Sequence, residues 1–232
     1  MSLEIITYKS PKSIIAESFR TLRTNLQFTV GEKNVKTLLV TSSMAGEGKS
    51  WTSSNLAVAF AQSGKRVLLV DADMRKGRQH KIFGISKNMG LSNYLSGVEI
   101  YMMDDNVSEE DVLIKMFHKT DVENLFVMSC GSTPPNPAEL MQSEKMKTLI
   151  EDLKDVFDII IFDGPPSGIV TDGVILASLV DSVVLVSSYR KTKTEDLKNT
   201  KKAIENVGGQ ISGVVLNRMP IDNKKKYGYY YG

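Results

Sequence analysis

The stretch Thr37–Ser50, TLLVTSSMAGEGKS, decides how the rest of the chain is interpreted. It begins with an apolar run, continues through a loop with two glycines, and ends in Gly-Lys-Ser. Glycines allow backbone N–H groups to turn inward, and the N-terminus of a following helix adds further donors. The stretch therefore predicts a strand, a loop that binds polyphosphate, and a helix.

Further apolar runs alternate with amphipathic stretches, which is typical of an α/β fold with a mostly parallel central sheet flanked by helices on both faces. We expect a single P-loop NTPase-like domain over residues 1–222 and a flexible tail over 223–232, which has no helical or strand period. Residues 84–122 are expected to form short helices and loops. The predicted strands are 37–41, 67–71, 125–129, 158–162, 182–187 and 211–216, and the predicted helices are 12–28, 51–63, 136–155 and 194–207.

The composition is that of an ordinary globular domain, with 41% hydrophobic and 24% charged residues among 232. The formal net charge of +2 is too small to indicate nucleic acid as a partner. The single cysteine, Cys130, excludes an internal disulfide and fits a reducing cytoplasm. No apolar run approaches the roughly 20 residues that a membrane-spanning helix needs, so we expect membrane association to require a partner.

The loop residues have separate expected roles. Lys49 is predicted to contact the β- and γ-phosphates of a nucleotide, and the Ser50 hydroxyl to hold Mg²⁺. Ser43 stands where the usual pattern has its first glycine, so the loop is a variant type. The predicted nucleotide-binding residues here are Ser43, Met44, Ala45, Gly46, Glu47, Gly48, Lys49, Ser50 and Trp51.

Carboxylates follow two other predicted strands, where open α/β sheets place their ligands. A phosphoryl-transfer site needs acidic groups around Mg²⁺, a proton acceptor, and cations on the transferring phosphoryl group. Arg75 either stabilises phosphate charge or forms a structural ion pair. We predict metal-site residues Ser50, Asp71, Asp73 and Asp163, and catalytic residues Lys49, Asp71, Asp73 and Arg75.

Four of the eight tyrosines lie among the last six residues, directly after Lys224–Lys226. They are Tyr227, Tyr229, Tyr230 and Tyr231. Together with a nucleotide-binding loop they suggest a protein that uses ATP and carries its own phosphate acceptors. The alternative is a tail that is merely adhesive and disordered.

These motifs resemble those of the bacterial tyrosine kinases (BY-kinases) of the capsular and exopolysaccharide type, which belong to the deviant P-loop group with the MinD/ParA ATPases. Residues 45–50 resemble Walker A, Asp71-x-Asp73-x-Arg75 resembles Walker A′, and residues 159–163 resemble Walker B. Residues 131–140 resemble the proline-rich stretch of the family, and the tail resembles its tyrosine cluster.

The resemblance implies an ATP- and Mg²⁺-dependent protein-tyrosine kinase that autophosphorylates its tail in trans and regulates capsular or exopolysaccharide biosynthesis. By resemblance, Asp73 and Asp163 hold waters of the metal and Asp71 activates the tyrosine hydroxyl, although either Asp71 or Asp73 fits that role. Asn217 is implied to read the adenine edge, with a plain turn residue as the alternative.

The oligomerisation motif of the family, E-x-x-R-x-x-R, matches Glu17, Arg20 and Arg23, whose spacing places them on one face of helix 12–28. The resemblance implies an octameric homo-oligomeric ring, a separate transmembrane activator, protein tyrosine substrates and a tyrosine phosphatase. It also implies a cytoplasmic protein held at the inner face of the membrane through its activator.

Two other functions remain open at this point. One is a MinD/ParA-like ATPase switch, which Met44 disfavours because that branch carries a signature lysine there. The other is a nucleotide-dependent scaffold with an adhesive tail. We interpret His80 and His118 as surface residues rather than ligands, and Trp51 either packs beneath the loop or faces a partner.

Overall fold

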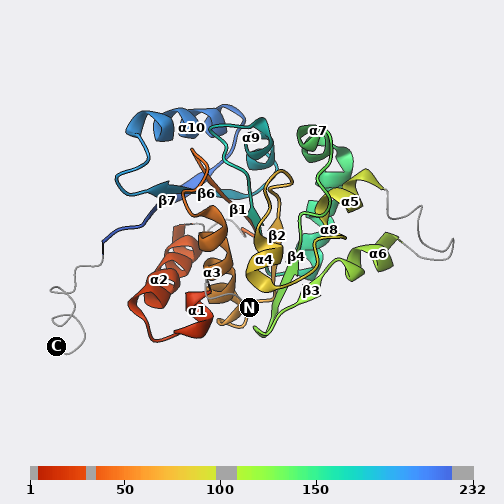
Figure 1. The fold of residues 1–232 in the computed structure, drawn as a ribbon, viewed down its shortest axis with the longest axis horizontal. Coiled ribbons are helices and arrows are strands. Elements are labelled where there is room, and N and C mark those ends of the chain that lie inside the picture. The colour runs from red at the N-terminus through yellow and green to blue at the C-terminus, as the bar shows by residue number, and fades with distance from the viewer. Residues whose placement is uncertain (1–4, 30–34, 98–108, 221–232) are drawn as a thin grey trace.

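A seven-stranded sheet in the order β3-β4-β2-β5-β1-β6-β7 forms the centre of the molecule (Figure 1). The computed structural model describes residues 5–29, 35–97 and 109–220. Every strand pairing within these residues is parallel except that of β3 with β4. The predicted α/β class with a mostly parallel sheet is therefore confirmed. The strands are β1 Thr37–Ser42, β2 Val67–Asp71, β3 His118–Lys119, β4 Leu125–Met128, β5 Ile159–Asp163, β6 Ser182–Ser188 and β7 Ile211–Asn217.

Helices cover both faces of this sheet (Figure 1). Among the described residues, no helix is both long and apolar enough to cross a membrane. The helices are α1 Ile6–Lys9, α2 Ile14–Thr29, α3 Lys49–Ala61, α4 Gln79–Phe83, α5 Leu91–Ser96, α6 Glu109–Lys115, α7 Pro137–Gln142, α8 Glu144–Val156, α9 Thr171–Ala177 and α10 Thr194–Asn206.

The two faces of the sheet belong to two hydrophobic clusters because successive side chains of a strand point in opposite directions. In β1, Leu39 packs in the cluster of α5 to α10, whereas Leu38 and Val40 pack in the cluster of α1 to α4. All six residues of β1 are buried. Burial on both faces explains why the strand is a continuous apolar run instead of an alternating one.

The helix predicted over residues 136–155 consists of two helices. The backbone turns extended at Ser143, with φ −64° and ψ 151°, and the Ser143 hydroxyl accepts the N–H of Met146 at 3.2 Å. This N-cap satisfies one free donor of α8 and so favours a new helix start. The short strand β3 and helices α1, α4 and α9 were not predicted.

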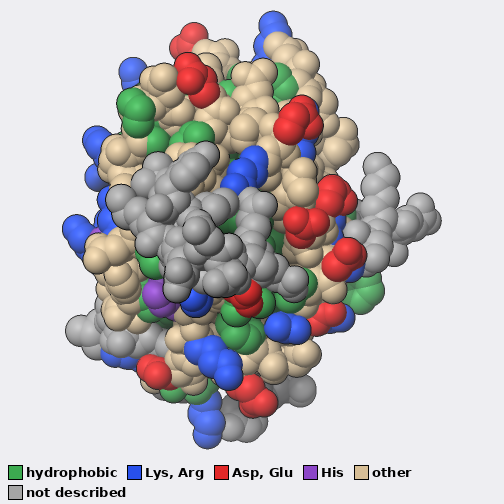
Figure 2. Space-filling view, turned by 90° about the vertical axis from the view of Figure 1, so that its right-hand side faces the viewer, with side chains coloured by type: hydrophobic (Ala, Val, Ile, Leu, Met, Phe, Trp, Pro, Cys, Tyr) green, Lys and Arg blue, Asp and Glu red, His purple; other side chains and the backbone are tan. Residues whose placement is uncertain are grey.

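Figure 2 shows the side of the molecule that lies to the right in Figure 1, where acidic and basic side chains are interspersed. The tail over residues 223–232, with its four tyrosines, lies outside the described residues. The structure therefore does not test the predicted phosphorylation sites or the flexibility of the tail.

Candidate active site

The loop between β1 and α3 has the backbone that phosphate binding needs. Gly46 and Gly48 have φ of +79° and +99°, which non-glycine residues rarely adopt. A Cβ at Gly48 would lie 2.0 Å from Nδ2 of Asn217, so glycine is also required by close packing. Because α3 begins at Lys49, the loop ends at the free N–H groups of a helix N-terminus.

A cavity of about 640 Å³ opens in front of this loop, within the range typical of small-molecule sites. The predicted residues that line it are Ala45, Gly46, Gly48, Lys49, Ser50, Trp51, Asp73, Arg75 and Asn217. Three predicted nucleotide-binding residues, Ser43, Met44 and Glu47, are not part of its lining. The structure thus brings most of the predicted site residues together around one cavity.

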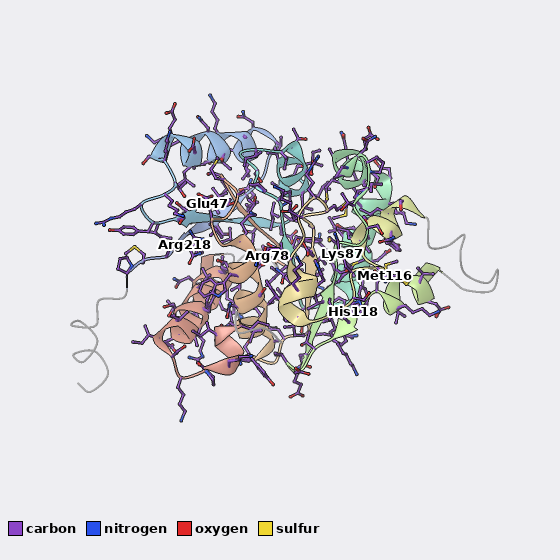
Figure 3. All side chains as sticks on the ribbon, viewed as in Figure 1. Glu47, Arg78, Lys87, Met116, His118 and Arg218 are labelled. Atoms are coloured by element: carbon purple, nitrogen blue, oxygen red, sulfur yellow. The ribbon has the colours of Figure 1, made fainter. Side chains whose placement is uncertain are left out.

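Glu47 has a structural contact that its place in the loop did not reveal. Its buried carboxylate accepts the N–H of Met44 at 2.9 Å and the hydroxyl of Thr192, which follows β6. Its carbonyl accepts Nδ2 of Asn217 at 2.9 Å. Figure 3 shows Glu47 and Arg218 on the β7 side of the loop and Arg78 on its α4 side. The hydrogen bonds of Glu47 therefore connect the phosphate loop to the segment after β6 and to the end of β7.

Two aspartates lie side by side beneath the loop, because β2 and β5 are neighbours in register. Asp71 pairs with Asp163, and the two residues are 0% and 1% exposed. Burial raises the pKa of Asp163 to about 6, although hydrogen bonds from Gln79 and Ser50 and the charge of Lys49 act in the opposite direction. Burial, followed by the charge of Asp163, raises the pKa of Asp71 well above its usual range.

The oxygen atoms in this pair fit a magnesium ion. Within the described residues, Oδ1 of Asp71 and Oδ1 of Asp163 are buried and have no hydrogen-bond partner. Buried acceptors without partners are costly. The Ser50 hydroxyl bonds to Asp163, so carboxylate and hydroxyl oxygens converge at one place. Mg²⁺ prefers such oxygen ligands together with water and phosphate.

Gln79 connects the two carboxylates and was missed by the sequence analysis. It is fully buried at the start of α4. Its backbone N–H donates to Oδ2 of Asp71 at 2.9 Å, and its Nε2 donates to Oδ2 of Asp163 at 2.7 Å. Its Oε1 accepts the Ser54 hydroxyl at 2.8 Å. No motif marks this glutamine, because its role depends on how residues 72–78 turn back toward β2.

Asp73 and Arg75 occupy the wall of the cavity instead of the buried pair. Asp73 accepts the N–H groups of Arg75 and Lys76 at 3.3 and 2.9 Å and thereby fixes the turn after β2. Arg75 forms a two-point ion pair with the buried Asp172 of α9, with distances of 2.7 and 3.1 Å. The ion-pair alternative for Arg75 is therefore present, while the residue still lines the cavity.

Trp51 was predicted either to pack beneath the loop or to face a partner, and in the structure it packs against α2. Its ring meets Phe19 of α2 edge-on, with centroids 5.1 Å apart. Trp51 also lines the cavity, so one side chain joins the N-terminal helix to the site. His80 and His118 both differ from the surface interpretation, because Nδ1 of His80 and Nε2 of His118 are buried and have no hydrogen-bond partner among the described residues.

The predicted oligomerisation residues have contacts inside the chain. Arg20 pairs with Glu17 and also donates to the carbonyl of Pro11. Arg23 donates from Nη1 to the carbonyl of Ala59 in α3 at 2.9 Å. All three side chains are half-buried, so the expected exposed charged face is partly engaged in packing α2. Their role between subunits stays a prediction.

Comparison with known proteins extends these observations. A family model described as an AAA domain matches residues 35–214. The putative tyrosine-protein kinase CapB of Staphylococcus aureus is 41% identical over 228 residues, which cover 98% of this chain and 95% of that protein.

Among solved structures, the chimerical protein CapA2B2 superposes with a TM-score of 0.85 at 36% identity, covering 95% of this chain and 92% of that one. The cell division ATPase MinD of Pyrococcus furiosus superposes with a TM-score of 0.64 at 24% identity, covering 82% of this chain and 74% of that one, which shows a shared P-loop fold alone. With its Walker-type loop and strand-end aspartates in place, this chain belongs to the family of bacterial tyrosine kinases.

Proposed function

We propose that this chain is an ATP-dependent protein-tyrosine kinase that phosphorylates its own C-terminal tyrosines in trans. We further propose that it regulates capsular or exopolysaccharide biosynthesis. The observation that carries the proposal is the buried pair Asp71 and Asp163, with an unpartnered oxygen on each, beside the Lys49 loop and its cavity. This combination supplies ligands for a metal, donors for phosphates and space for a nucleotide in one place.

The residues around the cavity have separate roles in an in-line phosphoryl transfer. The loop N–H groups and Lys49 would hold the phosphates of ATP, and Ser50, Asp73 and Asp163 would hold Mg²⁺ or its waters. Bound Mg²⁺ supplies neutralisation of the charge on the phosphates. The tyrosine oxygen forms its bond to the γ-phosphorus while the bond from that phosphorus to ADP breaks, and the phenolic proton passes to an aspartate.

Asp71 is our assignment for the proton acceptor. A phenol titrates near pH ~10, so it needs a base, and the raised pKa of Asp71 makes its carboxylate a stronger acceptor than an exposed aspartate. Asp73 is the alternative, because it lines the cavity whereas Asp71 is buried. Comparing pH–rate profiles of Asp71→Asn and Asp73→Asn decides between them, since only the acceptor variant loses the contribution of its carboxylate to the acidic limb, whereas the contribution of Asp163 stays in both.

The proposed assembly is a cytoplasmic homo-oligomeric ring, held at the inner face of the membrane by a transmembrane activator. The tail of one subunit would enter the site of the next, and a tyrosine phosphatase would reverse the modification. Support comes from the family relationship and from the sequence motif at Glu17, Arg20 and Arg23. Substrate proteins would present tyrosines to the same cavity.

Mass spectrometry tests the activity directly. The purified chain, with the cytoplasmic segment of the activator present, is incubated with Mg-ATP, and phosphate is mapped beside a Lys49→Met control. We expect phosphate on Tyr227, Tyr229, Tyr230 and Tyr231 only in the active protein. Phosphate that never reaches tyrosine would exclude the kinase.

A mixing experiment tests transfer in trans. A Lys49→Met chain with an intact tail is combined with an active chain in which the four tail tyrosines are changed to phenylalanine. Phosphate on the Lys49→Met chain supports transfer between subunits. If the wild type autophosphorylates but the Lys49→Met chain receives no phosphate, the reaction takes place within one chain.

The alternative is an ATPase switch, because MinD has the same P-loop fold. A switch would release inorganic phosphate and leave the tail mass unaltered in the first experiment. Met44, in place of the signature lysine of that branch, weighs against it.

A further inference from the structure

Three side chains of different chemistry meet at the C-terminal end of β2. They are the carboxylate of Asp71, the imidazole of His80 and the thiol of Cys130, and one potential ligand atom from each lies within 4.8 Å of the others. The parallel pairing of β2 with β4 brings Cys130 beside Asp71, and α4 adds His80 from the turn that follows β2.

Each of the three has an atom with little or no competing bond. Oδ1 of Asp71 and Nδ1 of His80 are buried without a hydrogen-bond partner among the described residues. Asp71 is 0% exposed, so this oxygen cannot recover the loss from bulk water. Cys130 is also fully buried, and its thiol makes a weak donation to the Gly131 carbonyl at 3.5 Å.

The charged neighbours of the three groups act in both directions. Burial, followed by the charges of Lys87 and Lys81, lowers the pKa of His80, which favours a neutral ring with a free lone pair. Burial, followed by the negative charge of Asp71, raises the pKa of Cys130 to about 12, whereas the charge of Lys87 lowers it. The thiol therefore has to lose its proton when a metal binds.

We propose that Asp71, His80 and Cys130 bind one zinc-class divalent cation. Sulfur and imidazole nitrogen select zinc over magnesium, and three protein ligands leave a fourth tetrahedral position for water. As the metal–sulfur bond forms, the thiol proton passes to solvent. Ligand atoms on a tetrahedral zinc lie about 3.5 Å apart, whereas the three atoms here lie within 4.8 Å of one another, so the three side chains draw together on binding.

The consequence for the kinase rests on the proposed function, whereas the binding does not. A zinc-class ion on Asp71 withdraws this carboxylate from the site shared with Asp163. Zinc therefore inhibits phosphoryl transfer while Mg²⁺, which avoids sulfur and nitrogen ligands, supports it.

Cobalt(II) is the probe for binding, because tetrahedral thiolate coordination gives it a strong charge-transfer absorption. The full chain without nucleotide is titrated with Co²⁺ and compared with Cys130→Ser, His80→Ala and, as the matched control, His118→Ala. We expect one Co²⁺ per chain with the thiolate band in the wild type and in His118→Ala. Cys130→Ser loses the band, and His80→Ala binds at least tenfold more weakly. Binding that is equal in all four proteins, or that lacks the thiolate band, overturns the site.

Gly77→Ala blocks the site without removing a ligand. A Cβ at Gly77 would lie 2.4 Å from Sγ of Cys130 and 2.6 Å from Oδ2 of Asp71. We expect this variant to keep its free thiol, fold as judged by a thermal melt, and lose the cobalt band. Retention of wild-type cobalt affinity contradicts the proposal.

Zinc inhibition of autophosphorylation completes the test. Wild type is inhibited by zinc at constant Mg-ATP, and Cys130→Ser is inhibited at least tenfold less effectively with unchanged basal activity. Equal inhibition of both proteins overturns the inhibitory role. If the chain shows the cobalt band but has no kinase activity, the metal site stands and the proposed function fails. Failure of the metal site can therefore be distinguished from failure of the proposed function.

Discussion

Gln79 shows how one residue outside every motif controls the geometry of the site. Its backbone bonds Asp71 and its side-chain amide bonds Asp163, so it sets the distance between the two carboxylates. The same Nε2 also reaches the Ser50 carbonyl at 3.2 Å, at the start of α3. Gln79 therefore links the phosphate loop, β2 and β5 through one buried side chain.

Replacing Gln79 by methionine keeps the volume and removes these bonds. We expect the free energy of unfolding to fall by about 2 to 3 kcal/mol, because Asp163 and the Ser54 hydroxyl lose buried partners. Urea unfolding measures the change. Gln210→Met is the matched control, since Gln210 is exposed and its side-chain amide donates to the Gly208 carbonyl at the surface. Equal effects of the two substitutions would remove the linking role of Gln79.

The raised pKa of Asp163 predicts an unusual dependence of stability on pH. The native state holds a proton between the unfolded value of 3.8 and the folded value of about 6, whereas the unfolded state has released it. Stability therefore falls as pH rises through this window. We expect a loss on the order of a few kcal/mol without Mg²⁺, to which Asp71 contributes with the same sign.

Urea unfolding between pH 4 and 7 tests this prediction by comparison with Asp163→Asn, which cannot titrate. The wild type should lose more stability across the window than the variant does. Parallel pH curves for the two proteins would mean that Asp163 titrates near its ordinary value. Kinase activity should depend on pH in the opposite direction from stability. It needs the ionised carboxylate of Asp163 and therefore falls below about pH 6.

At the scale of elements, α2 is attached to the site through one aromatic contact. Phe19 of α2 is buried against Trp51, the only tryptophan of the chain, which lies in the first turn of α3. We expect Phe19→Ala to lower the free energy of unfolding by about 3 kcal/mol and to shift the Trp51 emission to longer wavelength as its ring gains water. Phe28→Ala is the control, because Phe28 is 81% exposed. An unchanged emission in Phe19→Ala would contradict the contact.

The elements also show what the sequence could and could not predict. The apolar runs located six strands nearly to the residue, because burial on both faces makes most of these strands continuous apolar segments. The strand β7 is partly exposed and was located by its apolar run alone. Helix α9 was missed, and with it the partner of Arg75, since Asp172 is 97 positions away. The contact of Glu47 with Thr192 spans 145 positions. Motif spacing identified the loop and its aspartates, whereas these long-range pairs depend on the order of strands in the sheet.

At the scale of the whole molecule, the residues of the motif at Glu17, Arg20 and Arg23 make two different kinds of contact. Glu17 and Arg20 pair with each other at the surface of α2, and such pairs contribute little to stability. Arg23 bonds a carbonyl of α3 inside the chain. A triple substitution would therefore confuse loss of assembly with loss of packing.

We expect Glu17→Ala together with Arg20→Ala to lower the oligomer mass in light scattering and to change the free energy of unfolding by less than about 1 kcal/mol. Arg23→Ala should lower the free energy of unfolding by about 1 to 2 kcal/mol because the Ala59 carbonyl loses its donor. A mass that stays constant in the double variant would exclude this face from the subunit contact.

Phosphorylation of the tail would change the charge of every subunit in the proposed ring. The chain has a formal net charge of +2, and each phosphate adds about −1.5 to −2. Four modified tyrosines would leave each subunit at about −4 to −6 and turn the segment beside Lys224–Lys226 acidic. Subunits that all carry this charge repel one another, and added salt screens the repulsion. We therefore expect Mg-ATP to reduce the oligomer mass of the active chain in low salt, high salt to restore it, and the Lys49→Met chain to show no change. An oligomer of equal mass before and after complete phosphorylation would show that the tail charge does not control assembly.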